Sequence, residues 1–380
     1  MSHTNIETEA FVVAEPKAPF KLTPISLDEV RGNEILVEMK YTGICHTDIV
    51  VQQGLLQHLT EYPVVLGHEG AGIIKALGAN VTDKSLRVGD QVLLSYTTCQ
   101  GCGPCLEDRP TFCKTHTEVN FNAVRVDDKS TPARLADGKT TVRSQFFGQS
   151  SFARLSVVQD FCVVKCPVKD ILPCYAPLGC GFQTGAGTVL NAIKPTKSSR
   201  VVVFGLGSVG ISALLAAVHL EVKQVIGVDI VDSRLELVKE LGATDVINSA
   251  TEGGNLVEKL REITQGGADV TIDCSGAPSA LQAAIDCLGS GGQAVSVGVP
   301  PPGVKIDIET QSFFMAHKSY RSVIEGESTP AEFIPELIEL HRKGRFPVDK
   351  LCKVYSINDF EQALKDMHDG KVIKPIIKWD

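Results

Sequence analysis

Four cysteines are spaced closely enough to bind a single metal ion. Cys99, Cys102, Cys105 and Cys113 form the pattern C-x2-C-x2-C-x7-C, with glycine and proline among the residues between the first three. Glycine lets a loop curl tightly, so that several thiolates can converge on one point. Four sulfur ligands fill a tetrahedral shell, which suits zinc and leaves no position for a substrate. The spacing therefore favours a structural zinc site, with an iron–sulfur cluster or unliganded buried cysteines as the alternatives.

Three further residues offer a second ligand set, although they lie far apart in the sequence. Cys45 lies in the stretch GICHTD, His68 in GHEG and Cys180 in GCG. Two cysteine thiolates and one imidazole can hold zinc and leave its fourth position for water or a substrate, as in catalytic sites. Such an ion is a Lewis acid and lowers the pKa of a hydroxyl group bound to it. Spacing alone does not decide whether these three residues bind a metal together, because a lone cysteine is more typical of a protein core.

A glycine-rich hexapeptide indicates nucleotide chemistry. Gly205, Gly207 and Gly210 belong to GLGSVG, which fits the pattern G-x-G-x-x-G. The hexapeptide follows an apolar segment typical of a strand, residues 201–204, and opens a helix-like run from Ile211. In that context the glycines permit a tight turn and let a pyrophosphate group approach the positive end of the helix. The hexapeptide therefore predicts a dinucleotide-binding turn; the alternative is a doubly wound domain that binds no dinucleotide.

A carboxylate lies where the ribose of such a cofactor would be recognised. Asp229 ends the next expected strand, nineteen positions beyond Gly210, where a carboxylate can accept hydrogen bonds from both ribose hydroxyl groups. A 2'-phosphate there would meet its negative charge, so the sequence favours NAD over NADP. Arg234 weakens this preference, because it either pairs with such a phosphate or lies on a solvated helix surface.

Two kinds of element must position these residues. The first third of the chain has short alternating runs bounded by Gly, Asp and Pro, which are typical of a mostly β domain, at residues 34–39, 70–76, 90–94 and 152–158. From about Pro195, apolar segments alternate with helical ones, which predicts a doubly wound parallel sheet. Its expected strands are 201–204, 224–228, 245–247, 270–273 and 294–297, and its expected helices are 211–220, 233–241, 255–264 and 279–287.

The last part of the chain is expected to return to the first domain. Two helical segments, 330–342 and 357–369, precede an apolar strand at 372–378, and a buried closing strand needs a sheet to join. The one long polar stretch, residues 114–144, is expected to be a loop or lobe.

Composition excludes several classes of protein. The chain has 380 residues and 43% hydrophobic side chains, enough for full cores, and its 37 basic and 45 acidic residues give a formal charge of -8. No basic block is present, so a nucleic acid or an anionic membrane is not an expected partner. Residues 1–10 lack the basic start and apolar core of a signal peptide, and no apolar run approaches the roughly 20 residues of a membrane span. We expect a soluble, cytoplasmic protein in which the 12 cysteines point to metal or thiol chemistry instead of disulfides, with those outside the two ligand sets as packing residues.

Taken together, these motifs resemble the zinc-dependent medium-chain alcohol dehydrogenases, closest to the benzyl or aryl alcohol branch. The order and spacing match from about Pro24 to Lys378. The resemblance implies an α/β protein with a GroES-like, mostly β catalytic domain at residues 1–181 and 325–380. It further implies a Rossmann domain with a doubly wound parallel sheet at residues 182–324.

The resemblance also implies roles for the dispersed residues. Cys45, His68 and Cys180 match the ligands of the catalytic zinc, which together with the four-cysteine site makes two zinc ions per chain. Glu69 matches a carboxylate that binds the metal transiently during ligand exchange. Thr47 matches the hydroxyl group that takes the proton of the substrate and passes it toward the nicotinamide ribose.

Further residues match the NAD contacts of the family. His46 and Lys374 match residues that contact the cofactor pyrophosphate. Thr184 resembles the residue that touches the carboxamide side of the nicotinamide, and Val299 resembles the backbone contact to that amide.

The sequence departs from the liver-type pattern at the substrate pocket. Val50 stands where those enzymes place a histidine that completes the proton relay to solvent. Ser95 stands where they carry a bulky aromatic residue, so a larger pocket is expected. Phe146 and Phe147 are candidate flat walls of this pocket, although core packing is the alternative for both.

The expected reaction is the interconversion of a primary alcohol, aryl or allylic in type, and its aldehyde by hydride exchange with NAD(H). The alternatives are a pathway-specific reductase of an elaborate aldehyde or activated double bond, and a glutathione-dependent formaldehyde dehydrogenase. A non-catalytic binding protein is least expected, because every ligand position is filled. We expect a homodimer, with a tetramer as the alternative. Residues 316–326 resemble the edge through which the Rossmann sheets of two chains pair.

Overall fold

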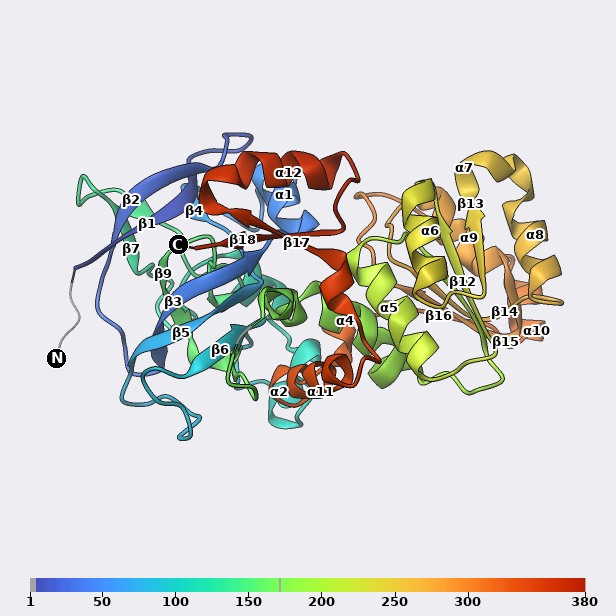
Figure 1. The fold of residues 1–380 in the computed structure, drawn as a ribbon, viewed down its shortest axis with the longest axis horizontal. Coiled ribbons are helices and arrows are strands. Elements are labelled where there is room, and N and C mark those ends of the chain that lie inside the picture. The colour runs from blue at the N-terminus through green and yellow to red at the C-terminus, as the bar shows by residue number, and fades with distance from the viewer. Residues whose placement is uncertain (1–4, 171, 380) are drawn as a thin grey trace. The chain divides into compact units, whose positions relative to one another are not determined.

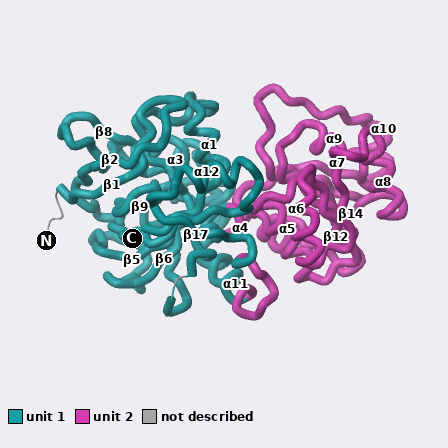
Figure 2. The backbone as a smooth tube through the Cα atoms, turned by 45° about the horizontal axis from the view of Figure 1, so that its top comes forward, with its two compact units in different colours: residues 1–180, 329–339, 349–380 teal, residues 181–328, 340–348 magenta. Residues whose placement is uncertain are grey.

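The computed structural model describes residues 5–170 and 172–379, and the chain divides into the two compact units coloured in Figure 2. Unit 1 comprises Met1–Cys180, Thr329–Glu339 and Asp349–Asp380, and unit 2 comprises Gly181–Ser328 and Leu340–Val348. Residues 1–4, part of the segment for which no export signal is expected, lie outside the described residues. Among the described residues, no helix is both long and apolar enough to cross a membrane.

A seven-stranded sheet is the frame of unit 1. Its strands run in the order β10-β6-β5-β3-β18-β17, and β9 pairs with β3 outside this path. The bounds are β3 Glu34–Gly43, β5 Gly70–Leu77, β6 Gln91–Leu94, β9 Leu155–Gln159, β10 Val163–Lys165, β17 Cys352–Ser356 and β18 Lys374–Lys378. The pairing of β18 with β3 is antiparallel, so the C-terminal strand, red in Figure 1, joins the N-terminal sheet as predicted.

A five-stranded sheet, in the order β4-β1-β2-β7-β8, completes the β structure of unit 1. Its strands are β1 Ile6–Val13, β2 Lys21–Leu27, β4 Val64–Val65, β7 Ala133–Leu135 and β8 Thr141–Val142. The polar stretch 114–144 is therefore more regular than the expected loop, because it supplies β7, β8 and the helix α3, His116–Phe121. The two strands are short, and short strands carry too few residues to show an alternating pattern.

The core of unit 1 joins the two ends of the chain. The ring of Phe11 on β1 stacks on that of Phe360, with ring centroids 4.0 Å apart, and Phe152 meets Phe360 edge-on at 5.2 Å. Buried aromatic pairs of this kind dominate the energetics of a core. They fix α12, Phe360–His368, against the N-terminal strand. Besides α3, the described part of this unit has the short helices α1 His46–Gln52 and α2 Gly103–Leu106.

Unit 2 is built on a six-stranded sheet with the order β13-β12-β11-β14-β15-β16, and every pairing is parallel. Its strands are β11 Arg200–Phe204, β12 Gln224–Asp229, β13 Asp245–Asn248, β14 Ala268–Asp273, β15 Leu288–Ser296 and β16 Ser319–Ser322. The central strands are nearly continuous apolar runs, as expected where both faces of a parallel sheet are covered. This sheet confirms the predicted doubly wound arrangement.

Helices connect the strands of this sheet, as Figure 1 shows for α5, α6, α8 and α9. The helices of unit 2 are α4 Gly181–Gly187, α5 Ser208–His219, α6 Asp232–Glu240, α7 Ser249–Glu252, α8 Leu256–Ile263, α9 Pro278–Asp286 and α10 Thr310–Met315. Helix α11, Pro330–Arg342, contributes residues to both units. The buried core of the sheet contains Val202 and Phe204 from β11 and Ile226 and Val228 from β12.

Candidate metal centres and nucleotide-binding turn

Unit 1 brings Cys45, His68 and Cys180 together. Their ligand atoms all lie within 4.8 Å of one another, although the residues come from three separate segments. Cys45 caps the N-terminus of α1, His68 lies in the connection between β4 and β5, and Cys180 follows the 3-10 helix Pro173–Gly179. The expected ligand set is therefore a spatial cluster.

Asp48 positions two of the three ligand segments. Its carboxylate accepts hydrogen bonds from the backbone N–H groups of Cys45 and Gly67, each at 3.0 Å, and it lies 3.0 Å from Nδ1 of His68. Because a carboxylate there keeps the proton on Nδ1, the lone pair of Nε2 is left for a metal. Asp48 is absent from the predicted site residues, although an acidic residue three positions after a helix cap is a capping signal.

The charges and hydrogen bonds of the cluster fit zinc. Nε2 of His68 is buried and has no hydrogen-bond partner among the described residues, and buried polar groups are normally paired. The hydrogen bond with Cys180 and the neighbouring His68 hold the pKa of Cys45 well below its usual value. Burial lowers the pKa of His68, but the charges of Asp48 and Cys45 outweigh burial and raise it well above its usual value. The raised pKa of His68 reflects the negative charge of Asp48 and Cys45 around the imidazole, and a bound zinc ion would neutralise that charge.

Glu69 and Lys374, expected at the zinc and at the cofactor, form a buried ion pair with each other. Nζ of Lys374 lies 2.9 Å from each carboxylate oxygen of Glu69 and donates to the carbonyl of Ile44 at 3.2 Å. Burial raises the pKa of Glu69, an effect that Lys374 opposes. A Cβ atom on Gly43 would lie 2.1 Å from Glu69 Oε2, so this glycine makes room for the carboxylate. The transient metal binding of Glu69 and the pyrophosphate contact of Lys374 stay predictions.

The remaining residues of α1 differ in their surroundings. Oγ1 of Thr47 lies 3.8 Å from Sγ of Cys45, in reach of the ligand cluster. His46 is exposed, and Val50 is half-buried. The proton-transfer role of Thr47 and the cofactor contact of His46 stay predictions.

Two phenylalanine rings lie against the imidazole of His68. Phe147 stacks on it with ring centroids 4.6 Å apart, and Phe146 meets it edge-on at 5.5 Å. Both rings are buried. Ser95 is buried too, and its hydroxyl group donates to the carbonyl of Gly179 at 2.6 Å. The structure thus brings all three near the ligand segments, and their predicted role in a substrate pocket stays a prediction.

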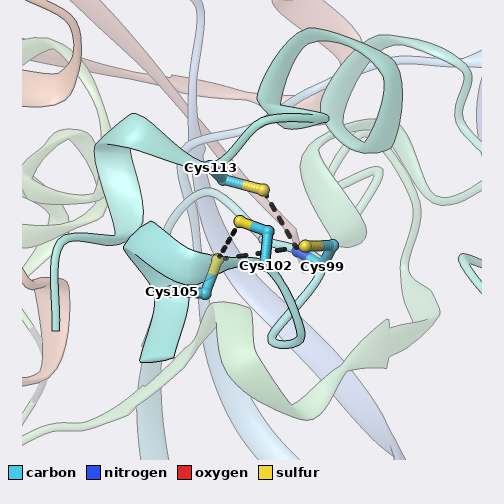
Figure 3. A group of neighbouring side chains, drawn as sticks. All are labelled: Cys99, Cys102, Cys105 and Cys113. Atoms are coloured by element: carbon cyan, nitrogen blue, oxygen red, sulfur yellow. Dashed lines mark hydrogen bonds between the residues drawn. The ribbon is translucent and has the colours of Figure 1, made fainter. Parts of the chain in front are cut away.

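The four cysteines of the closely spaced set, Cys99, Cys102, Cys105 and Cys113, also converge, and Figure 3 shows their sulfur atoms gathered together. Sγ of Cys105 lies 3.5 Å from that of Cys102 and 4.0 Å from that of Cys99. Backbone N–H groups donate to two of the sulfurs, from Cys99 to Cys113 and from Lys114 to Cys102, each at 3.4 Å. Such bonds stabilise thiolates, and four clustered thiolates fit a closed zinc shell.

In unit 2 the glycine-rich hexapeptide forms the turn between β11 and α5. Gly205 has a φ of +80°, and a Cβ atom there would lie 2.8 Å from the backbone nitrogen of Ser275. A Cβ atom on Gly210 would lie 1.9 Å from the carbonyl oxygen of Gly205. Gly207 caps α5, and a Cβ atom there would meet nothing within 4 Å. The tight turn thus requires glycine at positions 205 and 210. Gly207 instead leaves the approach to the N-terminus of α5 open, as the binding of a pyrophosphate group requires.

Asp229, the last residue of β12, stabilises this turn through hydrogen bonds. Its carboxylate accepts hydrogen bonds from the backbone N–H groups of Leu206, Ile230 and Val231 at 2.6, 2.8 and 3.0 Å. Nη1 of Arg234 lies 3.6 Å from the same carboxylate. The guanidinium group therefore faces Asp229, and the contacts of both residues with the cofactor stay predictions.

The other two expected cofactor residues of unit 2 have contrasting environments. Oγ1 of Thr184 donates to the Glu325 carboxylate at 3.1 Å. Val299 is 90% exposed. Their expected contacts with the nicotinamide stay predictions.

Comparisons with known proteins agree with this geometry. Residues 31–168 match the alcohol dehydrogenase GroES-like domain, and residues 208–342 match the zinc-binding dehydrogenases. A geraniol dehydrogenase of Castellaniella defragrans is 35% identical over 98% of this chain and 98% of its own. An S-(hydroxymethyl)glutathione dehydrogenase of Komagataella pastoris is 32% identical, covering 98% of this chain and 97% of its own. The crystal structure of benzyl alcohol dehydrogenase from Acinetobacter calcoaceticus superposes with a TM-score of 0.91 and 39% identity, over 99% of this chain and 100% of that one.

A GroES-like unit with two sulfur-rich ligand sets, together with a parallel sheet that carries a glycine-rich turn, defines a zinc-dependent dehydrogenase. The chain belongs to the family of zinc-dependent medium-chain alcohol dehydrogenases. This membership confirms the predicted fold class, the predicted enzyme class and the predicted cofactors, zinc and NAD.

Proposed function

We propose that this alcohol dehydrogenase interconverts a primary alcohol of aryl or allylic type and its aldehyde, with NAD(H) as the hydride carrier. The observation that carries the proposal is the convergence of Cys45, His68 and Cys180 within 4.8 Å, beside two buried phenylalanine rings. Geraniol and benzyl alcohol, the alcohols named for two similar proteins, are both primary alcohols whose reacting carbon is bonded to an unsaturated carbon. This shared chemistry supports the aryl or allylic class.

Different residues of unit 1 bind the metal and transfer the proton in the proposed reaction. Cys45, His68 and Cys180 would hold the catalytic zinc, which supplies a Lewis acid that stabilises negative charge on the substrate oxygen. The Thr47 hydroxyl, next to Cys45, accepts the proton that the alcohol oxygen loses and passes its own proton on toward the nicotinamide ribose. The hydride leaves the carbon that bears the hydroxyl group and goes to nicotinamide C4, so the alcohol loses two electrons and NAD gains them.

The aromatic side chains beside His68 make one side of the site apolar. Phe146 and Phe147 are buried against the imidazole, so they exclude water from one side of it. A dry, low-dielectric wall strengthens the electrostatic interactions of the site. Flat aromatic surfaces also suit a substrate with a ring or a conjugated double bond.

A panel of alcohols tests this proposal. Benzyl alcohol, geraniol, ethanol and S-(hydroxymethyl)glutathione are each assayed with NAD and with NADP. We expect the highest kcat/KM for benzyl alcohol or geraniol with NAD. A highest kcat/KM for the glutathione adduct would instead favour the formaldehyde dehydrogenase activity. In a parallel assay with an unsaturated aldehyde and NADH or NADPH, formation of a saturated product would favour the reductase.

A variant of the ligand cluster tests the catalytic assignment separately. Replacement of Cys45 by Ala should abolish turnover, because it removes one of three ligands, while NADH binding, measured by fluorescence, stays close to that of the wild type. Alcohol oxidation by Cys45→Ala at the wild-type rate would contradict the assignment.

We also infer that the enzyme forms a homodimer through the edge of the unit 2 sheet. β16 lies at the end of the strand order, and the side chains of Phe314, Met315, Tyr320 and Ile324 around it are exposed. An exposed edge with apolar side chains is a template for pairing with a second copy. Light scattering should give twice the mass of one chain, and Ile324→Lys should shift the protein toward the monomer. A wild-type monomer would contradict the inference.

The state of the cysteines supports a cytoplasmic location. None of the twelve, all of which lie within the described residues, forms a disulfide bond, and disulfides are rare in reducing compartments. Fractionation of cells that express the full chain should recover the protein with the cytosol; recovery with an exported fraction would contradict this location.

A further inference from the structure

One buried glutamine, Gln149, holds the segment that carries His68. Its side chain is 0% exposed. Nε2 donates to the carbonyl oxygens of His68 and Ser95 at 3.0 and 2.8 Å, and Oε1 accepts from the backbone N–H of Gly70 at 3.0 Å. The side-chain amide thus bonds on both sides of Glu69, as the peptide of a neighbouring strand would.

The same glutamine is connected to the segment of Cys180. Ser95, whose carbonyl accepts from Gln149, donates its hydroxyl group to the carbonyl of Gly179 at 2.6 Å. The two backbones lie so close that a Cβ atom on Gly179 would be 1.8 Å from the carbonyl oxygen of Leu94. A continuous set of hydrogen bonds therefore runs from the residue before Cys180, through Ser95 and Gln149, to His68 itself.

The turn that presents Gln149 also carries the ring stacked on His68. Phe147 and Ser150 have φ values of 52° and 46°, which lie in the left-handed region that bulky residues avoid. Such conformations persist where the surroundings over-determine them, and they are frequent at functional sites. Ser150 Oγ accepts from Phe146 N at 2.8 Å and donates to the carbonyl of Val65 at 2.7 Å, and these bonds hold the turn against the strand before His68.

We propose that Gln149 is a positioning residue for the catalytic zinc: it fixes the backbone of His68 and, through Ser95, that of Cys180, so that both ligands face Cys45. The inference rests on the proposed function, because it requires zinc at these three residues. Gln149 acts through the ligand segments, so its loss should affect how firmly the metal is held. Partners of metal ligands that do not touch the metal commonly change metal affinity about 10-fold to 100-fold.

Gln145, in the same turn, provides a matched control. It is also fully buried, its Nε2 donates to Glu34 Oε1 at 2.9 Å and to the carbonyl of Val157 at 3.3 Å, and its Oε1 accepts from Gln159 at 2.7 Å. Gln145→Met and Gln149→Met therefore remove three buried hydrogen bonds each, with similar side-chain volumes. Only the second variant releases the backbone of a zinc ligand.

The test measures metal retention in the purified, zinc-loaded enzyme. A chromogenic chelator follows the release of the two zinc ions, and the absorption bands of the enzyme with cobalt(II) at the catalytic site report the ligand geometry. We expect Gln149→Met to release one zinc about 10-fold to 100-fold faster than the wild type and to shift the cobalt bands. Gln145→Met should release both ions at the wild-type rate, even if its melting temperature falls equally.

The outcomes separate this inference from the proposed function. Zinc release from Gln149→Met at the wild-type rate, or equal acceleration in Gln145→Met, would overturn the positioning role. If Gln149→Met does not fold, Gln149→Glu takes its place, because it keeps the acceptor for Gly70 and loses both donors; the same acceleration is expected. Cys45→Ala should bind one zinc per chain, and two ions bound to that variant would instead overturn the proposed catalytic site.

Discussion

Lys374 and Glu69 form a buried ion pair across 305 positions of the sequence, with Nζ 2.9 Å from both carboxylate oxygens. Lys374 is 1% exposed. The pair fixes the first residue of the C-terminal strand β18 to the residue that follows His68. The last strand of the chain is therefore held to the segment of a metal ligand by charge as well as by its pairing with β3.

Removal of one partner of this pair should destabilise the protein strongly. Lys374→Met leaves the Glu69 carboxylate buried without its cation, and such a loss costs about 3–5 kcal/mol of the free energy of unfolding. The double variant Lys374→Met, Glu69→Gln should recover much of this loss, because no isolated charge remains. Urea denaturation measures both. A single variant within about 1 kcal/mol of the wild type would show that the pair contributes little.

Asp48→Asn should weaken the catalytic zinc site and leave the four-cysteine site unchanged. The amide cannot hold the proton of Nδ1 as a carboxylate does, and the expected loss of metal affinity is about 10-fold to 100-fold. Competition with a chelator of known affinity measures the change. Two equally tight zinc ions in this variant would contradict the role of Asp48 in orienting His68.

The four-cysteine site should contribute stability, with no direct part in turnover. In Cys105→Ser the shell loses one thiolate, so the protein should bind one zinc per chain instead of two and should melt at a lower temperature. Metal analysis and calorimetry of the same sample check both points. Retention of two zinc ions with an unchanged melting temperature would count against a structural zinc at this loop.

Alkaline pH should destabilise unit 2 through Cys287. Burial raises the pKa of this thiol from about 9 to about 12. Since the folded pKa is the higher one, the thiol contributes its full stability below pH 9 and loses it as the pH rises toward 12. The loss is about 1.4 kcal/mol per pH unit in this window.

Comparison with Cys287→Ala isolates this effect. Between pH 10 and pH 11, where the thiol is ionised in the unfolded chain and protonated in the folded one, the free energy of unfolding of the wild type should fall more than that of the variant, by about 1.4 kcal/mol. Equal pH dependence of the two proteins in urea denaturation would contradict the shifted pKa.

Local patterns predict much of the fold and of the candidate site. The cysteine loop and the glycine turn each lie within one short segment, so their spacing alone indicates the arrangement that the structure shows for Cys99–Cys113 and Gly205–Gly210. The alternation of apolar strands and helical segments beyond Pro195 predicts the parallel sheet, although the short elements β16, α7 and α10 are absent from the prediction. The grouping of Cys45, His68 and Cys180 needed the resemblance to a family, since no local spacing relates them.

Contacts between distant segments account for what the sequence does not show. Asp48 and Gln149 are absent from the predicted site residues, because an aspartate or a glutamine alone gives no sign that it will bond the segment of His68. The same holds for the pairing of Lys374 with Glu69. Strands β1 and β2 are also absent from the predicted elements, because exposed and buried residues are mixed along them.

The proposed catalytic zinc site joins three residues of unit 1 that are distant in the sequence. X-ray diffraction from crystals of the zinc-loaded enzyme, recorded on both sides of the zinc absorption edge, locates the metal without reference to activity. We expect two anomalous peaks per chain: one among Cys45 Sγ, His68 Nε2 and Cys180 Sγ, and one within the four-cysteine loop. A crystal with a peak at the loop but none between residues 45, 68 and 180 would contradict it.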